Sequence, residues 1–226
     1  MGAEGPVVLS TNDTGIREAV DLLASGNIVA APTDTVYGIA ARLDRPQALR
    51  RLFLAKGRPE AKAIPILLGD EEIAADLSDA PQTVMALAAA FWPGGLTVVT
   101  AARPGLPHEV VTVESDGSGT VALRLPDNDV MRELCRRSGG ALAVTSANAS
   151  GDPPATSAAT VLTSRLQHLA AVVDGGQTSG PLPSTIVSIR GQHLQVIREG
   201  VIPGHLVTSV WHDMNGSADR RGMISR

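Results

Sequence analysis

Small polar clusters interrupt a sequence that is otherwise rich in small apolar residues. The first is PTDTVYG at residues 32–38, which follows an apolar run and carries two threonine hydroxyls and a carboxylate. Such groups on a turn can orient a small zwitterion through hydrogen bonds. The same residues can instead form an ordinary turn closed by an Asx-type bond from Asp34, and the spacing leaves both interpretations open.

The second cluster is cationic and consists of Lys56, Arg58 and Lys62. Gly57 and Pro59 end the helical pattern that precedes it, so we expect these cations on a loop and not on a helix face. Arginine supplies a planar fork and lysine a point charge, and together they can hold a triphosphate. Alternatively, cations in the last turn of a helix only compensate its dipole.

Arg124 is the only charged residue inside the apolar run TVALRLP, residues 120–126. If this strand is central, a buried arginine needs an anionic partner, and a substrate carboxylate is one candidate. If the strand lies at an edge of the sheet, Arg124 faces water and has no such requirement.

Further polar residues stand at the ends of predicted strands. Ser146 and Asn148 follow the run ALAV, at the carboxyl end of a strand where open α/β sheets bind their ligands. Asn-Ala-Ser-Gly also favours a simple turn. Ser184 opens another strand and Arg198 closes the last one. Together these residues suggest a cleft lined by hydroxyls and cations, without a catalytic nucleophile.

Several common catalytic motifs are missing from the sequence. It contains no Walker A loop, no H-E-x-x-H and no G-x-S-x-G. The run GSGTVA at 117–122 matches a relaxed dinucleotide pattern, but it leads into a predicted strand where that site needs a helix. Cys135 is the single cysteine, which excludes a disulfide framework and a cysteine-rich metal site, and we expect an inert, half-buried thiol.

The elements that must position these residues follow from hydrophobic periodicity. Apolar strands alternate with amphipathic helices, which indicates an α/β fold with a substantially parallel or mixed sheet. We expect one domain over residues 1–206 and a polar, mobile C-terminal tail over 207–226. The predicted strands are 7–10, 28–31, 35–40, 64–68, 96–100, 120–126, 141–146, 170–176, 184–189 and 194–199, and the predicted helices are 16–26, 46–56, 81–92, 127–137 and 155–166.

Composition limits the class of protein. The 226 residues are 43% hydrophobic and only 2% aromatic, so a globular core must be built from Ala, Val, Leu and Ile. A net charge of −4 with mixed signs disfavours a long nucleic-acid footprint and favours a small anionic substrate in a local basic pocket. Neither a secretory signal nor an apolar stretch of about 18 residues is visible, so we expect a cytoplasmic protein.

Eight motifs occur in an order that resembles the YrdC-type threonylcarbamoyl-AMP synthases, over roughly residues 10–205. The resemblance implies an open, twisted mixed α/β sheet with flanking helices and a large concave cleft, in the single-domain form. It also implies a nucleotidyltransferase that converts L-threonine, bicarbonate and ATP into threonylcarbamoyl-AMP and pyrophosphate, with Mg2+ bound mainly through ATP. The motifs are PTDTVYG, KGRP, WPGGLTVV, TVALRLP, TSANASG, DGG, PSTIV and VIREG.

The resemblance also implies roles for individual residues. Thr35 and Arg124 match positions that bind L-threonine, Arg124 through the carboxylate. Lys56 and Arg58 match catalytic cations, which with Lys62 meet the phosphates and the bicarbonate-derived group. The chain departs from the family pattern where Leu67 or Leu68 replaces a histidine of some relatives, and where Lys62-Ala63-Ile64-Pro65 replaces a Lys-Pro-Leu type sequence. The implied ATP-binding residues are Lys56, Arg58, Lys62, Thr120, Ser146, Asn148, Ser184 and Arg198.

The implied product serves N6-threonylcarbamoyladenosine modification of tRNA through downstream threonylcarbamoyl-transferase proteins, with weak or no direct tRNA binding. Two other functions are compatible with the same fold. One is a carbamoyl-transfer domain that uses carbamoyl phosphate. The other is an RNA-binding or ribosome-maturation factor, against which the net charge and the scarcity of aromatic stacking residues argue.

Overall fold

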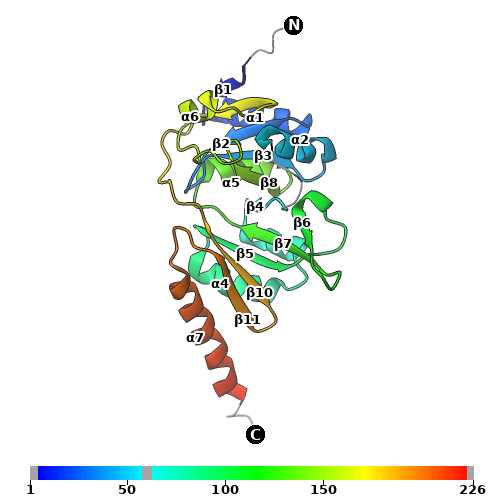
Figure 1. Ribbon diagram of the computed structural model, residues 1–226, viewed down its shortest axis with the longest axis vertical. Coiled ribbons are helices and arrows are strands. Elements are labelled where there is room, and N and C mark those ends of the chain that lie inside the picture. Colours follow the sequence, from blue (N-terminus) through cyan, green and yellow to red (C-terminus); the bar gives the residue numbers. More distant parts are fainter. Residues whose placement is uncertain (1–4, 58–62, 223–226) are drawn as a thin grey trace.

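The computed structural model describes residues 5–57 and 63–222, which form a mixed α/β structure with its termini at opposite ends of the long axis (Figure 1). The strands are β1 (Val7–Leu9), β2 (Ile28–Ala31), β3 (Gly38–Arg42), β4 (Ile66–Leu68), β5 (Leu96–Ala101), β6 (Val111–Val113), β7 (Gly119–Arg124), β8 (Ala141–Ser146), β9 (Leu169–Val173), β10 (Thr185–Arg190) and β11 (His193–Arg198). The helices are α1 (Asp13–Ala24), α2 (Pro46–Lys56), α3 (Ala74–Leu77), α4 (Pro81–Phe91), α5 (Asp129–Arg137), α6 (Ala158–Thr163) and α7 (Gly204–Gly222), with 3-10 turns η1 (Glu71–Ile73) and η2 (His108–Val110).

All strands join one open sheet in the order β1-β9-β2-β3-β8-β4-β7-β5-β10-β11, with β6 paired to β7. The sheet is mixed: β4 runs parallel to β7 and β5 to β10, whereas β8 is antiparallel to β3 and β4. This confirms the predicted open mixed sheet with flanking helices.

Two hydrophobic cores cover the sheet, and they cover it unequally. The first core contains residues of α2, α3, α4 and α7 together with Val121 and Leu123 of β7. The second core contains residues of α1 and α5 packed on β1, β2, β3, β4, β8 and β9, and none from β5, β7, β10 or β11. Side chains alternate along a strand, so Thr120 and Arg124 lie on the face of β7 away from the first core. That face is left uncovered by the second core.

The helix boundaries follow local sequence signals. The side chains of Asn12 and Asn128 accept hydrogen bonds from Gly15 N and Met131 N, each at 3.0 Å, and so cap α1 and α5. Helix α2 begins at Pro46 and ends at Gly57, which adopts the left-handed conformation with φ of 59°. Lys56 is therefore in the last turn of the helix, which agrees with the alternative interpretation and not with the expected loop position.

The C-terminal part differs from the prediction. The expected polar tail from residue 207 is instead helical in the described chain, because α7 runs from Gly204 to Gly222 across the predicted boundary. Val207 and Trp211, four residues apart, lie on one side of this helix and are buried in the first core. The indole of Trp211 also donates a hydrogen bond to Gln192 O at 3.1 Å.

Other elements differ as well. β3 begins at Gly38 and not at residue 35, α6 is shorter than the predicted 155–166, and η1–α3 and η2–β6 were not predicted. Among the described residues, the structure has no helix with both the length and the apolar character that a membrane crossing requires.

Candidate functional site

The turn between β2 and β3 is organised by the hydroxyl of Thr33. This hydroxyl donates to Val36 O at 2.7 Å and accepts from the amides of Thr35 and Val36, each at 3.2 Å. The shorter contact to Val36 O takes the single proton of Thr33, so we assign Thr35 as the donor in the 3.1 Å bond between the Thr33 and Thr35 hydroxyls. Thr33 thus closes the turn, and not the Asx-type bond from Asp34 that was one of the two interpretations open from the sequence.

Arg124 lies at the end of β7, which is an interior strand between β4 and β5. The residue is 5% exposed, which confirms the buried alternative and excludes the edge-strand one. Its Nε donates to Gly94 O at 2.9 Å, Nη1 to the Thr35 hydroxyl at 3.3 Å and Nη2 to Asp34 Oδ1 at 2.6 Å. Burial lowers the pKa of Arg124, and the charge of Asp34 partly opposes this effect. The anionic partner in this structure is a protein carboxylate.

Arg198 and Ser184 form a second group near Arg124. The guanidinium of Arg198 donates to Ser184 O at 2.7 Å and to its hydroxyl at 3.2 Å, and that hydroxyl also bonds Thr97 Oγ1 at 2.8 Å. Arg198 has an exposed side, yet loss of water around its guanidinium lowers its pKa, and the positive charge of Arg124 lowers it further. Two guanidinium groups therefore interact across this part of the sheet, an arrangement suited to an anion.

Lys56 belongs to a third group, with Ser146 and Asn148 at the end of β8. Its Nζ donates to Ser146 O at 2.7 Å, to Ser146 Oγ at 2.9 Å and to Asn148 Oδ1 at 3.3 Å. The lysine is 7% exposed. Its ammonium group thus reaches across to β8, which is a structural role beyond capping its own helix.

The turn at 33–37 connects these groups. β3 pairs with β8 so that Gly38 lies opposite Ser146, and Ala147 N donates to Tyr37 O at 2.8 Å. On its other side, Gly180 N donates to Thr35 O at 2.7 Å, and the Tyr37 hydroxyl donates to Gly176 O at 2.8 Å. The motifs that hold Thr35, Ser146 and the DGG run are therefore neighbours in space.

Among the described residues, one predicted site residue, Thr120, is not part of this arrangement. Thr120 lies on the same face of β7 as Arg124, four residues away, and donates to Glu114 Oε1 at 3.2 Å. No hydrogen bond among the described residues joins it to another predicted site residue. Arg58 and Lys62 lie outside the described residues, so their predicted roles stay predictions.

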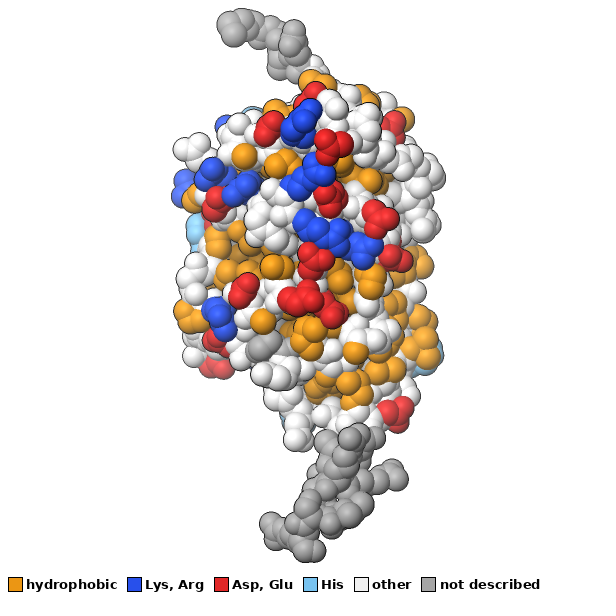
Figure 2. All heavy atoms as spheres, turned by 180° about the vertical axis from the view of Figure 1, so that it is seen from behind, with side chains coloured by type: hydrophobic (Ala, Val, Ile, Leu, Met, Phe, Trp, Pro, Cys, Tyr) orange, Lys and Arg blue, Asp and Glu red, His pale blue; other side chains and the backbone are white. Residues whose placement is uncertain are grey.

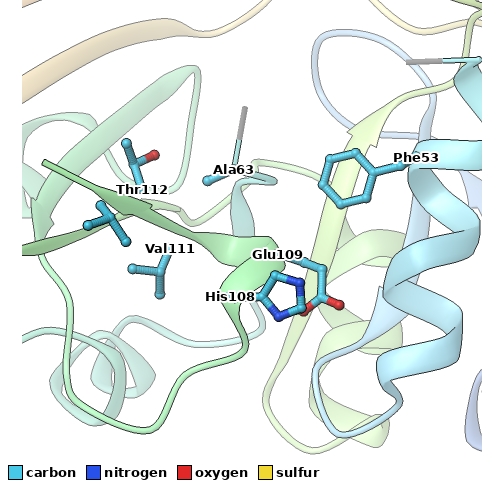
Figure 3. Close-up of a pocket in the computed structure, with 7 residues that line it drawn as sticks. Phe53, Ala63, His108, Glu109, Val111 and Thr112 are labelled. Carbon is cyan, nitrogen blue, oxygen red and sulfur yellow. The ribbon is translucent and has the colours of Figure 1, made fainter. Parts of the chain in front are cut away.

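A cavity of about 240 Å³ lies beside α2 and η2–β6, apart from the predicted residues that the structure describes (Figure 3). It contains one group that the sequence did not reveal, the buried carboxylate of Glu109. Within the described chain, Glu109 Oε1 has no hydrogen-bond partner, and its Oε2 lies 3.3 Å from His108 Nδ1. The lining residues are Phe53, Ala63, His108, Glu109, Val111, Thr112 and Val113.

The sequence reasoning missed three contacts of the site. Asp34 was a recognised polar residue, but its bond to Arg124 spans 90 positions and has no local signal. Thr97 was visible only as a hydroxyl inside the apolar run LTVVT. Gly94 contributes its carbonyl oxygen, which side-chain types cannot indicate.

Comparison with known proteins now decides the family. A family model for Sua5, YciO and YrdC proteins, described as "Telomere recombination", matches residues 21–200. The chain belongs to this family. A threonylcarbamoyl-AMP synthase of Bacillus subtilis is 36% identical over 203 residues, which cover 89% of this chain and 58% of the relative. A threonylcarbamoyl-AMP synthase of Vibrio cholerae is 32% identical over 82% of this chain and 97% of the relative.

A solved structure of the same family agrees with the fold. The crystal structure of Pyrococcus abyssi Sua5 complexed with L-threonine matches with a TM-score of 0.82 and 31% identity, over 90% of this chain and 60% of that one. The chain thus spans less than two thirds of the Bacillus and Pyrococcus proteins, whereas it covers nearly all of the Vibrio protein.

Proposed function

We propose that this family member is an L-threonylcarbamoyladenylate synthase, which makes threonylcarbamoyl-AMP and pyrophosphate from L-threonine, bicarbonate and ATP. The observation that carries the proposal is Arg124. A buried guanidinium lies on the face of β7 that neither hydrophobic core covers, beside a second guanidinium and near a lysine–serine–asparagine group. Relatives that carry this activity in their names, and a related structure with L-threonine, support the same conclusion.

The groups of the site divide between the substrates. We assign the threonine carboxylate to Arg124, with Thr35 beside it. We assign ATP and its phosphates to the remaining hydroxyl, amide and cationic groups of the predicted site. These are Lys56, Arg58, Lys62, Thr120, Ser146, Asn148, Ser184 and Arg198.

The chemistry needs no covalent intermediate with the protein. Bicarbonate releases carbon dioxide and hydroxide; the amine of threonine attacks the carbon dioxide, its proton leaves with the hydroxide as water, and an N-carboxy adduct forms. That carboxylate attacks the α-phosphate of ATP, the bond to the β-phosphate breaks, and pyrophosphate leaves. The protein contributes by holding the reactants in line and by placing positive charge where negative charge develops. Lys56 and Arg58 are the cations assigned to that stabilisation.

We propose that Mg2+ binds together with ATP and mainly through it. The groups around Lys56 are an ammonium, a hydroxyl and an amide, which suit phosphate oxygens better than a divalent cation. The described residues include no cluster of three or more His, Cys, Asp or Glu side chains that could hold a metal. We therefore assign Mg2+ to the phosphate oxygens of ATP, where it would neutralise charge on the leaving pyrophosphate.

The remaining assignments concern the cellular setting. We propose that the protein acts in the cytoplasm and passes its adenylate to threonylcarbamoyl-transferase proteins that modify tRNA, without a strong tRNA contact of its own. The mixed surface charge supports the last point, since tight tRNA binding relies on a basic surface.

Pyrophosphate release from ATP tests the function, with threonine and bicarbonate omitted in turn. The proposal predicts release only when both are present. Release that requires neither would contradict it. A parallel reaction with carbamoyl phosphate in place of threonine and bicarbonate distinguishes the proposed function from the carbamoyl-transfer alternative. The alternative predicts turnover only when carbamoyl phosphate is present.

A further inference from the structure

We propose that Asp34 recognises the α-amino group of the amino-acid substrate and thereby makes the site selective for zwitterions over simple carboxylic acids. This inference rests on the function proposed above and assigns one substrate group to Asp34, which the motif PTDTVYG offered only among several polar groups able to orient a zwitterion. It depends on which donors and acceptors around Arg124 are still available.

The donors of Arg124 are only partly used. A guanidinium has five N–H groups, and the hydrogen bonds to Gly94, Thr35 and Asp34 use one each on Nε, Nη1 and Nη2. One N–H therefore remains on each terminal nitrogen, and these two N–H groups are available to the oxygens of a carboxylate. Arg124 can bind a substrate carboxylate without releasing Asp34.

The groups next to these donors are acceptors. Asp34 uses Oδ1 for Arg124, and no described residue donates to its Oδ2. The Thr35 hydroxyl gives its proton to Thr33 and accepts from Arg124, which leaves one lone pair. Both groups can therefore accept hydrogen bonds from a substrate, and Asp34 as a carboxylate can only accept, so a positively charged or N–H-bearing group fits beside them.

Electrostatics then sets the selectivity. Asp34 is half-buried and lies 2.6 Å from the guanidinium that binds the incoming carboxylate. A substrate with a carboxylate alone brings its negative charge close to that of Asp34, in surroundings where water screens the repulsion weakly. An α-amino acid carries an ammonium group one carbon away from its carboxylate and compensates the charge of Asp34. A repulsive element of this kind rejects anions that lack the amine.

The test compares L-threonine with (R)-3-hydroxybutyrate, which is threonine without its amino group. Binding of each ligand is measured by calorimetry on the full chain, as wild type and as Asp34→Asn. Asparagine keeps an oxygen acceptor for Arg124 and nearly the same volume but removes the charge. We expect the wild type to prefer threonine by at least about tenfold, and Asp34→Asn to lose most of that preference. The loss should come from weaker threonine binding, with equal or tighter binding of hydroxybutyrate.

Asp44→Asn is the matched control, because Asp44 also pairs with an arginine, Arg42, but on the surface and beyond the far end of β3. It should leave both affinities unchanged. If Asp34→Asn weakens both ligands equally, Asp34 only holds Arg124 in place and the inference is overturned. If the wild type binds threonine and hydroxybutyrate with equal affinity, the inference is also overturned. This comparison needs no variant, so it applies even if Asp34→Asn does not fold. If the wild type binds no threonine at all, the proposed function itself fails.

Discussion

At the scale of single residues, Arg124 is bound in the structure by three different kinds of acceptor. A backbone carbonyl, a hydroxyl and a carboxylate hold its side chain, so its orientation is set before any ligand arrives. Preorganisation of this kind lowers the cost of binding because the side chain has little freedom left to lose. The geometry of the fork, and not only its charge, should therefore matter for threonine.

Arg124→Lys tests this point because lysine keeps the charge and loses the planar fork. We expect the KM for threonine to rise by about 10- to 100-fold, since one or two charge-assisted hydrogen bonds are lost. The KM for ATP should stay within about threefold. Steady-state pyrophosphate release measures both constants, with Arg42→Lys as a control at an exposed arginine–aspartate pair. An unchanged KM for threonine would show that Arg124 does not bind threonine.

Cys135 illustrates the opposite case, a potentially reactive residue that the fold makes inert. It is fully buried, not half-buried as expected, and its thiol donates to Leu67 O at 3.4 Å. Burial raises the pKa of the Cys135 thiol from 9.0 to about 12. The expected inertness follows, because the thiolate and not the thiol is the reactive form.

Thiol labelling and a pH series check this residue. Near pH 8, we expect negligible labelling of the native protein and complete labelling in concentrated guanidinium chloride, and Cys135 is the only cysteine that can react. The raised pKa also has a consequence for stability. Between pH 9.0 and about 12 the unfolded thiol loses its proton while the folded one keeps it, so the free energy of unfolding falls with rising pH in that range. Rapid labelling of native protein would contradict the burial.

At the scale of elements, the sequence predicts those parts whose signals are local. Helices α1, α2 and α5 carry apolar periodicity, caps or a proline start, and they occur where periodicity places them. The start of β3 could not be predicted, because the hydroxyl of Thr33 closes a turn within an otherwise strand-like run. The short strand β6 exists through its pairing with β7, which no local pattern reports.

The site shows the same division between local and non-local information. Lys56, Arg124, Ser146 and Ser184 could be selected because polar residues at strand or helix ends are unusual in an apolar sequence. The pairing between residues could not be predicted, since the bonds from Lys56 to Asn148 and from Arg124 to Asp34 join residues about 90 positions apart. The order of strands β3, β8, β4 and β7 determines those encounters.

Helix α7 gives a prediction at this scale. If it belongs to the fold, Trp211→Ala should lower the free energy of unfolding by about 3 kcal/mol, because a large side chain that is 5% exposed leaves a cavity. Urea unfolding followed by circular dichroism measures the change. The exposed neighbour His212, changed to Ala, should alter stability by no more than about 0.5 kcal/mol. Equal, small effects of both substitutions would mean that α7 does not stabilise the fold.

At the scale of the whole molecule, charge is mixed and not concentrated. On the face shown in Figure 2, basic and acidic side chains alternate over the upper half. On α5, Arg136 pairs with Asp70 at 2.9 Å and Arg137 with Asp13 at 2.7 Å. Such pairs leave little net field on this surface to steer a polyanion. Two guanidinium groups lie together instead on the open part of the sheet, Arg124, which pairs with Asp34, and Arg198, and a site of this size matches a small anionic substrate.

The central claim is that this molecule joins three small substrates into one adenylate, and the composition of the product tests it most directly. The protein is incubated with ATP, L-threonine and radiolabelled bicarbonate, and the nucleotides are separated by chromatography. The account predicts one new nucleotide that contains adenosine, threonine and the labelled carbon, and that is absent when threonine is omitted. ATP consumption that yields no labelled adenosine-containing product, or a labelled nucleotide that forms equally well without threonine, would contradict it.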